Sequence, residues 1–325
     1  MSILTDSQRE QFDRDGYLVV ENVLGPLEDF GPVFAEYAHI LDGLAEVLHT
    51  QGRIKDTYRD LPLHMRLIKI SQETGRTYSQ YFDISLPQSG IQPNTPIHVG
   101  PGIFRLLTNE RLLDIATEFI GPEIYSNPVQ HIRMKLPRKV MDQQTPDYLA
   151  KPVPWHQDNG VVLPEADETR TLTMWVPLTR ATSENGCMQV IPASHTRGLA
   201  DHCPVSGTVS IPQKALTDAQ LDAAVTLPME PGSVLFMDRH TVHCSLENTT
   251  TDQARISLDL RYSPIGEPTG RPDFPGFIAR STSAPHTELR DPAVWAQNWM
   301  EARRRLARKS QFAFNRWDGS ALVCA

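Results

Sequence analysis

The chain has 325 residues, 40% of them hydrophobic, which is enough to bury a large core in one large domain or two modest ones. Its 31 basic and 39 acidic side chains give a formal net charge of −8, which argues against nonspecific nucleic-acid binding and against an anionic membrane surface as partner. No run approaches the roughly 18 apolar residues of a membrane-spanning helix, so we expect neither nucleic acid nor membrane as a partner.

The N-terminus has no basic stretch followed by an apolar run, so no secretory signal is visible and we expect a cytoplasmic protein. The cysteines form no CxxC pair, which argues against a zinc site built from paired thiolates. In a reducing compartment they are expected to be free thiols. The four cysteines are Cys187, Cys203, Cys244 and Cys324.

The N-terminal part, residues 1–123, is predicted to be mainly helical. Thr5 is a candidate N-cap because Gln8 follows three residues later, and Gly121-Pro122 is a typical end of a helix. The predicted elements are helices over Thr5–Phe12, about Pro26–His49 and Asn109–Ile120, a strand over Gly16–Val20, and a Pro- and Gly-rich loop over Ile84–Gly102.

From Ile124 onward, short β-type runs alternate with turn residues, a pattern typical of a sandwich or barrel. The predicted strands are Val129–Leu136, Thr171–Leu178, Gly186–Ile191, Ser233–Met237 and Arg255–Tyr262. We therefore predict one mainly β domain with flanking helices, consisting of a helical part (1–123), a β core (124–262) and a C-terminal cover (263–325) with a helix near Asp291–Arg308. A separate N-terminal helical domain is the alternative, but no linker supports it.

A candidate metal site lies in Trp155-His156-Gln157-Asp158. Residues i and i+2 of a strand face the same way, so His156 and Asp158 can chelate one ion. His243, just after a later β run, is a candidate third ligand. Two histidines and one carboxylate suit non-haem Fe(II), although zinc or manganese accepts the same ligands. The motif alone is weak, because a surface strand end or a capping aspartate gives the same pattern.

The run Arg255–Tyr262 alternates strictly between apolar and polar residues. Ile256, Leu258, Leu260 and Tyr262 form one face, and Arg255, Ser257, Asp259 and Arg261 form the other. The polar face is either exposed to water or lines the interior of a barrel. In the second case, Arg255 offers a planar fork of donors to a carboxylate such as the distal one of 2-oxoglutarate.

At this point the sequence resembles the phytanoyl-CoA dioxygenase family of Fe(II)/2-oxoglutarate oxygenases. Four blocks match in the family's order and together span most of the chain. They are Thr5–Val23, Trp155–Asp158, the ENGCMQVIPASHTRG block of Glu184–Gly198, and Gly232–Arg255 with its Gly, His-x-Ser, Asn and Arg. One departure is Ala193, which stands where the family usually has glycine in a Pro-Gly-Ser-His turn.

The resemblance implies a double-stranded β-helix, also called a jelly roll or cupin-like fold, with helices on one side. It implies His156, Asp158 and His243 as iron ligands, and its spacing from Gly232 favours His243 over the nearby His240.

For the co-substrate, the resemblance implies that Arg255 binds the 2-oxoglutarate carboxylate and that Ser245 lies near it. Arg133, which shares a strand face with His131 and Lys135, is a further candidate contact. Because Asp158 is present, the halogenating variants of the family, which lack this carboxylate, are disfavoured.

These residues predict an oxygenase that uses Fe(II), 2-oxoglutarate and O2 to hydroxylate, desaturate or cyclise a small organic substrate, releasing succinate and CO2. A cupin-like metal isomerase or hydrolase and a non-catalytic ligand-binding β-helix protein are the alternatives. Loops 84–102 and 264–286 are expected to select the substrate, and the acidic chain favours a free small molecule over a CoA ester. His202 is interpreted as loop surface and Trp175 as core.

Overall fold

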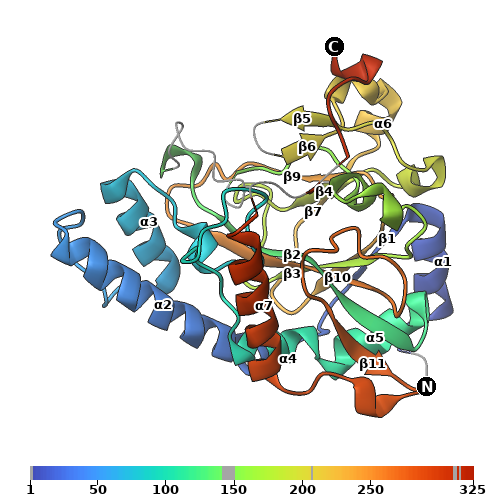
Figure 1. Cartoon of the computed structure of the whole chain (residues 1–325). Coiled ribbons are helices and arrows are strands. Elements are labelled where there is room, and N and C mark those ends of the chain that lie inside the picture. The colour runs from blue at the N-terminus through green and yellow to red at the C-terminus, as the bar shows by residue number, and fades with distance from the viewer. Residues whose placement is uncertain (1–2, 141–150, 206–207, 310–312, 315) are drawn as a thin grey trace.

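The computed structural model describes residues 3–140, 151–205, 208–309, 313–314 and 316–325. A six-stranded antiparallel sheet crosses the middle of the molecule, and a three-stranded antiparallel sheet faces it (Figure 1). In order, the large sheet contains β1 (Tyr17–Val20), β8 (Val234–Asp238), β3 (Leu172–Pro177), β10 (Arg255–Pro264), β2 (Glu123–Lys135) and β11 (Phe277–Ser281). The small sheet contains β7 (Val225–Leu227), β4 (Met188–Val190) and β9 (His243–Ser245), and β5 (Cys203–Val205) pairs with β6 (Thr208–Ser210) beside it.

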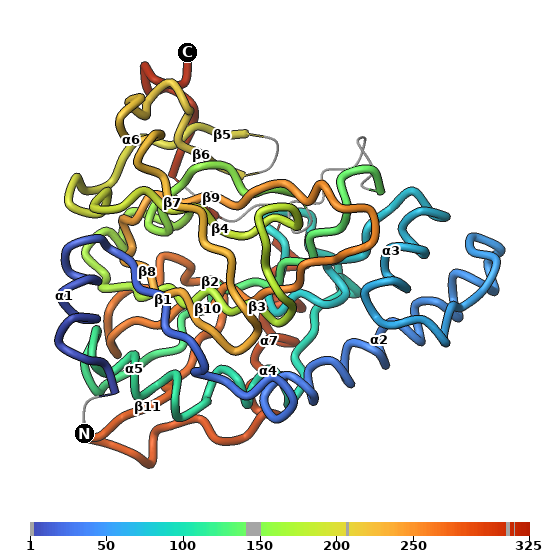
Figure 2. Tube along the Cα trace, turned by 180° about the vertical axis from the view of Figure 1, so that it is seen from behind, coloured from blue at the N-terminus to red at the C-terminus, as the bar shows by residue number. Residues whose placement is uncertain are grey.

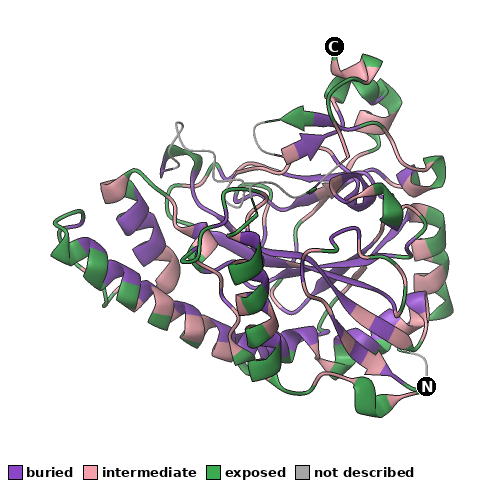
Figure 3. Cartoon of the chain, viewed as in Figure 1, coloured by how far each residue is buried: buried purple, intermediate pink, exposed green. Residues whose placement is uncertain are grey.

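Most of the helices lie on the side of the large sheet that points away from the small one, whereas the short helix at Asp218–Asp222 lies beside β5 and β6 (Figures 1 and 2). The helices are α1 (Asp6–Asp15), α2 (Gly31–Thr50), α3 (Leu63–Thr74), α4 (Pro101–Leu107), α5 (Glu110–Ile120), α6 (Asp218–Asp222) and α7 (Pro292–Leu306). The apolar face of β10, represented by Ile256 and Leu258, is buried in one cluster with Leu112 and Leu113 of α5. Burial is therefore concentrated along the sheets and the inward sides of the helices (Figure 3).

The predicted N-terminal elements are confirmed. Thr5 caps α1, and its side chain and that of Gln8 form a capping box. Asn109 caps α5 with hydrogen bonds to two backbone N–H groups. The helix predicted from Pro26 is also present, although its first five residues form a π-helical turn before α2 begins.

The fold class predicted for the whole chain is confirmed as well. The five predicted β runs correspond to β2, β3, β4, β8 and β10, and the sheets face each other without closing into a barrel. The sequence did not predict α3, α4 and α6 or the short strands β5, β6, β7, β9 and β11, four of which have only three residues. The division into helical part, core and cover stays a prediction. No helix of the described ranges is long and apolar enough to cross a membrane.

The expectation of four free thiols is wrong. Cys203 of β5 is joined by a disulfide to Cys324 near the C-terminus, whereas Cys187 and Cys244 are free and buried. The partners lie 121 residues apart in the sequence, so no local motif could reveal the pair. Because disulfides are rare in a reducing cytoplasm, the cysteines no longer support the cytoplasmic location, which stays a prediction.

We expect thiol titration to separate these two pairs. Native, unreduced protein should offer almost no reactive thiol, because both free cysteines are buried, and burial raises the pKa of Cys244 to about 12. Denaturation without reductant should release two thiols, and reduction should release all four. Four thiols after denaturation alone would contradict the disulfide.

Candidate metal centre and co-substrate pocket

Two backbone hydrogen bonds bring together the histidines of the candidate metal site. His156 and His243 form an antiparallel bridge in which each N–H donates to the other's carbonyl oxygen at 3.0 Å. Directly opposite residues in such a bridge project to the same face. The two rings accordingly lie with their centroids 4.2 Å apart.

The carboxylate of Asp158 completes the cluster. Gln157 has extended backbone angles, so Asp158 points to the same side as His156, although it begins a short 3-10 turn, Asp158–Val161, and is not in a strand as predicted. Its Oδ1 lies 4.0 Å from Nε2 of each histidine. All three side chains are buried, and their ligand atoms lie within 4.8 Å of one another.

The hydrogen bonds of both rings fix which nitrogen faces the cluster. Nδ1 of His156 donates to the carbonyl oxygen of Pro154, and Nδ1 of His243 donates to that of Thr241, each at 2.9 Å. A carbonyl oxygen only accepts, so Nδ1 of each ring carries a proton and Nε2 is the nitrogen that faces Asp158. Burial, and then the neighbouring His243, hold the pKa of His156 well below its usual range. Two imidazoles that present Nε2 and one carboxylate fit a divalent transition metal.

Two further side chains hold the carboxylate, and the sequence reading assigned neither a role. Thr173 of β3 donates to Oδ2 of Asp158, and Arg261 of β10 donates to Oδ1. Arg261 also donates to the carbonyl oxygen of Val129 at 2.7 Å, which anchors the guanidinium. Burial opposes ionisation of Asp158, but the interactions with Arg261, His243 and His156 together outweigh it and hold the pKa of the carboxyl below its ordinary value.

The other histidines lie outside this cluster. The group of described residues that can hold a metal does not include His240, in agreement with the choice of His243. The prediction that His202 lies on a loop surface is wrong, because the ring is fully buried. Its Nε2 accepts from the backbone N–H of Gln157 at 3.0 Å, between the two ligands of the motif. Burial lowers the pKa of His202 to about 4, so the ring is neutral at pH 7 and able to accept.

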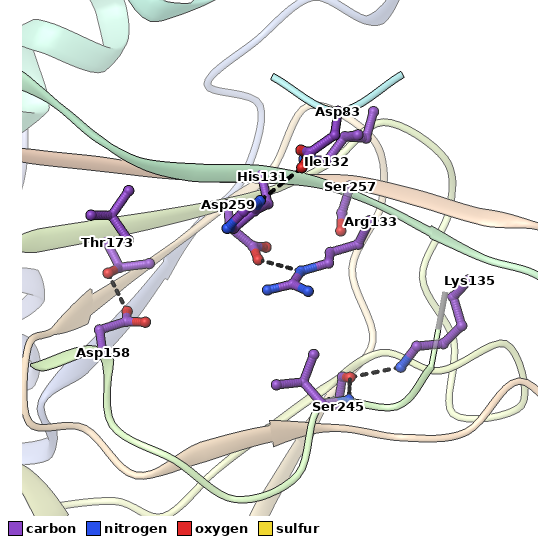
Figure 4. A network of polar contacts seen from close by, with 12 residues as sticks. Asp83, His131, Ile132, Arg133, Lys135, Asp158, Thr173, Ser245, Ser257 and Asp259 are labelled. Atoms are coloured by element: carbon purple, nitrogen blue, oxygen red, sulfur yellow. Dashed lines mark hydrogen bonds and ion pairs between the residues drawn. The ribbon is translucent and has the colours of Figure 1, made fainter. Parts of the chain in front are cut away.

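Next to the cluster lies a narrow pocket, here called the inner pocket, lined by all three candidate ligands and by the three predicted co-substrate contacts Arg133, Ser245 and Arg255. Arg255 is 1% exposed, with its guanidinium 5.4 Å from the ring centre of Trp175. Trp175 lines the inner pocket as well as packing in the core. Arg133 forms an ion pair with Asp259 at 2.8 Å (Figure 4).

Lys135, mentioned in the sequence reading only for its strand face, is a fourth polar side chain of this region. Its Nζ donates to Oγ of Ser245 at 2.7 Å, just behind the pocket wall (Figure 4). In the β2–β10 register Lys135 lies directly opposite Arg255. Neither cation forms an ion pair with any carboxylate of the described ranges, and like charges directly opposite destabilise a sheet. Burial, and then Arg255 and Arg133, hold the pKa of Lys135 well below its usual range.

Gly186 explains why the Asn-Gly-Cys block belongs to this site. A Cβ at this position would lie 2.5 Å from Cδ of Lys135 and 2.6 Å from the carbonyl oxygen of Leu246, and the backbone has a φ of +94°. Its own carbonyl oxygen accepts from Nε of Arg255 at 3.1 Å. Glycine therefore makes room for one cation of the pair and orients the other.

A larger cavity of about 310 Å³, here called the outer cavity, adjoins the inner pocket. The two share Arg133, Val153, His156 and Arg261 in their walls. His131 also lines the outer cavity, and its Nδ1 bonds to the buried carboxylate of Asp83 at 2.9 Å (Figure 4). The two loops expected to select the substrate each contribute one residue, Gln88 and Arg271, and the rest of the wall comes from other segments.

A family model of phytanoyl-CoA dioxygenases (PhyH) matches residues 12–257. The chain belongs to the phytanoyl-CoA dioxygenase family. Among curated relatives, the 1-deoxypentalenic acid 11-beta-hydroxylase of Streptomyces arenae is 30% identical over 136 residues, which cover 40% of this chain and 46% of that protein. The phytanoyl-CoA dioxygenase domain-containing protein 1 of Bos taurus is 25% identical over 307 residues, which cover 84% of this chain and 94% of that protein. The match thus spans under half of the length of the first of these relatives and nearly all of the second.

Solved structures of the same fold include the non-heme monooxygenase ThoJ, with a TM-score of 0.55 and 17% identity over 92% of this chain and 98% of that one. The non-heme alpha ketoglutarate dependent carbocyclase SnoK has a TM-score of 0.50 and 18% identity, covering 89% of this chain and 94% of that one. At these identities the likeness supports the fold.

We expect Arg261 to be a positioning residue for the Asp158 carboxylate. Arg261→Met should lower the affinity for Fe(II) by about 10- to 100-fold, as is usual when a partner that orients a metal ligand is lost. Metal titration followed by calorimetry measures this directly. Arg170→Met, which removes an exposed arginine from its ion pair with Glu267, is the matched control, and equal iron affinity of the two variants would contradict the role.

Proposed function

We propose that this chain is an Fe(II)- and 2-oxoglutarate-dependent oxygenase that hydroxylates, desaturates or cyclises a small organic molecule at an unactivated C–H bond. Succinate and CO2 are the co-products. One observation carries this proposal. A buried group of two histidines and one carboxylate lies beside two buried cations, Lys135 and Arg255. These two cations lie directly opposite each other, and no described carboxylate forms an ion pair with either.

The candidate ligands fit iron in this role. His156, Asp158 and His243 would hold Fe(II), which supplies the activation of O2 once 2-oxoglutarate is bound. The carbonyl oxygens of Pro154 and Thr241 fix the orientation of the two imidazole rings, so that Nε2 of each faces the site. Arg261 helps to hold the pKa of the Asp158 carboxyl below its ordinary value. Zinc or manganese would accept the same atoms, so the ligands alone do not select the reaction.

The cation pair is what favours a dicarboxylate co-substrate. A buried charge without a partner costs several kcal/mol of stability, and a bound carboxylate removes that cost for both cations together. Arg255 remains charged near neutral pH although burial lowers its pKa to about 10. The metal ligands and the cations line or adjoin one narrow pocket, so one molecule can reach both. A metal isomerase or hydrolase would leave the pair unexplained.

Ser245 and Arg133 complete the proposed 2-oxoglutarate site. Oγ of Ser245 accepts from Nζ of Lys135 and from the backbone N–H of Val153, so its own proton is available to a carboxylate in the pocket. Arg133 is assigned to the same site because it lines the inner pocket, with Asp259 sharing its charge. Trp175 and Met188 add apolar walls, which exclude water from the co-substrate.

The first test compares two neighbouring histidines. We expect His243→Ala to abolish stoichiometric Fe(II) binding and the conversion of 2-oxoglutarate to succinate in the presence of O2. His240→Ala, three residues earlier and outside the cluster, should retain both. Metal analysis of anaerobically loaded protein and chromatographic measurement of succinate provide the two readouts. Iron binding and turnover that survive in His243→Ala would refute the proposed metal centre.

The second test concerns Lys135. Lys135→Met should raise the KM for 2-oxoglutarate by about 10- to 100-fold, the expected loss for a charged hydrogen bond. The exposed Lys139→Met is the matched control. Because the pKa of Lys135 is lowered, the ammonium charge is lost as pH rises through that folded-state pKa, and the KM of the unmodified protein should rise with it. A pH profile that is the same in Lys135→Met and the unmodified protein would contradict this role.

A further inference from the structure

We propose that residues 316–325, here called the strap, position the metal ligand Asp158, and that the Cys203–Cys324 disulfide holds the strap in place. The inference rests on the proposed function, because it concerns the ligand geometry and the regulation of that same metal centre. Breaking the disulfide is therefore expected to lower the affinity of the folded protein for Fe(II).

The residue between the two ligands of the metal motif, Gln157, is anchored by the loop that leads into β5. Its side-chain amide donates to the carbonyl oxygen of Gly198 and accepts from the backbone N–H of Ala200, each at 2.8 Å. Its backbone N–H donates to Nε2 of His202 at 3.0 Å. Three hydrogen bonds thus tie the centre of the metal motif to this loop, and the next residue along the loop is Cys203.

The strap holds the 3-10 turn that begins with the ligand carboxylate. The guanidinium of Arg316 donates to the carbonyl oxygens of Asn159 and Val162, each at 3.2 Å. The indole Nε1 of Trp317 donates to the carbonyl oxygen of Gly160. A single 3-10 turn satisfies few of its own carbonyl groups, so these donors supply partners that the turn itself lacks. The strap therefore fixes the orientation of the backbone that carries the ligand.

His202 joins the loop, the turn and the strap. Its ring stacks on that of Trp317, with the centroids 5.3 Å apart and an interplanar angle of 27°. A Cβ at Gly160 would overlap the imidazole, so glycine lets the turn approach the ring closely. Nδ1 of His202 donates to the carbonyl oxygen of Ala200 at 2.8 Å, which leaves Nε2 as the acceptor for Gln157. We therefore assign His202 as a positioning residue for the metal motif.

The disulfide is the strongest attachment of the strap. None of residues 316–325, all of which the structure describes, is buried, so the hydrophobic effect contributes little to their position. The ion pair of Arg316 with the half-exposed Asp167 is open to solvent on its carboxylate side and holds the strap only weakly. A covalent bond, in contrast, fastens Cys324 to Cys203 of β5 (Figure 1).

Reduction by a dithiol is the step that would release the strap. The dithiol supplies two electrons and two protons, the S–S bond breaks, two cysteine thiols form, and the dithiol itself closes to a disulfide. The turn then loses its fixed donors, and His202 loses its fixed stacking partner. Arg261 and Thr173 still hold the carboxylate oxygens of Asp158, so the loss of metal affinity is partial.

The first test compares the anaerobic affinity of the oxidised and the reduced full chain for Fe(II), measured by calorimetry after the reductant has been removed. We expect reduction to weaken binding by about tenfold, the lower end of the loss that follows removal of a partner of a metal ligand. Circular dichroism checks that the reduced protein remains folded. The double variant Cys203→Ser, Cys324→Ser should bind Fe(II) as the reduced protein does and should not respond to reductant.

A purely stabilising disulfide predicts a different result. Reduction would then lower the temperature of thermal unfolding and leave the Fe(II) affinity of the folded protein unchanged. That result would overturn the proposal.

The second test concerns His202. His202→Phe keeps a ring beside Trp317 but removes the acceptor for Gln157, and should weaken Fe(II) binding by about tenfold. His202→Gln, whose amide oxygen can accept, should regain part of that affinity. His286→Phe, at an exposed histidine outside the turn and the strap, is the matched control and should retain all of it. Equal affinity in His202→Phe and His286→Phe would contradict the positioning role. If His202→Phe fails to fold, reduction of the unmodified protein decides the question.

Hydrogen exchange separates this outcome from that of the proposed function. Deuterium uptake by residues 156–162 is measured without metal, and we expect it to be faster after reduction, because the Gln157–His202 hydrogen bond then opens more often. If the oxidised protein binds no Fe(II), the proposed metal centre fails, and the exchange still decides whether the disulfide holds the turn. If Fe(II) binds equally well before and after reduction, or uptake does not change, the strap proposal is wrong and the metal centre stands.

Discussion

The site depends on one backbone contact, the antiparallel bridge between His156 and His243. Each residue donates to and accepts from the other, so their side chains must project to one face at close range. The bridge joins two chain segments that are far apart in the sequence, and each ring is then turned by the carbonyl oxygen two residues before it. Burial strengthens this arrangement, because an unmade backbone hydrogen bond in the interior is costly.

Strand β10 supplies the charge that surrounds the bridge, and an irregularity in its pairing determines where that charge lies. Asp259 pairs with His131, whereas Arg261 pairs with Asn127, so β2 advances four residues while β10 advances two. Such a bulge re-aims the side chains beside it. Here the carbonyl oxygen of Val129, inside the bulge, anchors Arg261, and Arg261 then reaches Asp158. The bulge thus couples the register of the sheet to the carboxylate of the metal site.

This dependence on register shows what the sequence could and could not predict. The placing of His156 beside Asp158 and the polar face that carries Arg255 follow from local periodicity, and the structure brings these residues together. The positions of Lys135 and Arg261 depend on which residue of β2 lies opposite which residue of β10, and no local pattern specifies that. The burial of His202 and the Cys203–Cys324 disulfide likewise depend on how the C-terminal segment returns to β5.

The charges around the metal site fall into two groups with different requirements. Lys135 and Arg255 form a buried cation pair that no carboxylate of the described ranges neutralises. Beside them, Arg133 with Asp259 and Arg261 with Asp158 are ion pairs in the wall that the inner pocket shares with the outer cavity. Because each of these ion pairs balances its own charge, a bound anion gains most from Lys135 and Arg255. The separation of the two groups therefore suits the site to a dicarboxylate co-substrate that reaches both the cation pair and the three ligands.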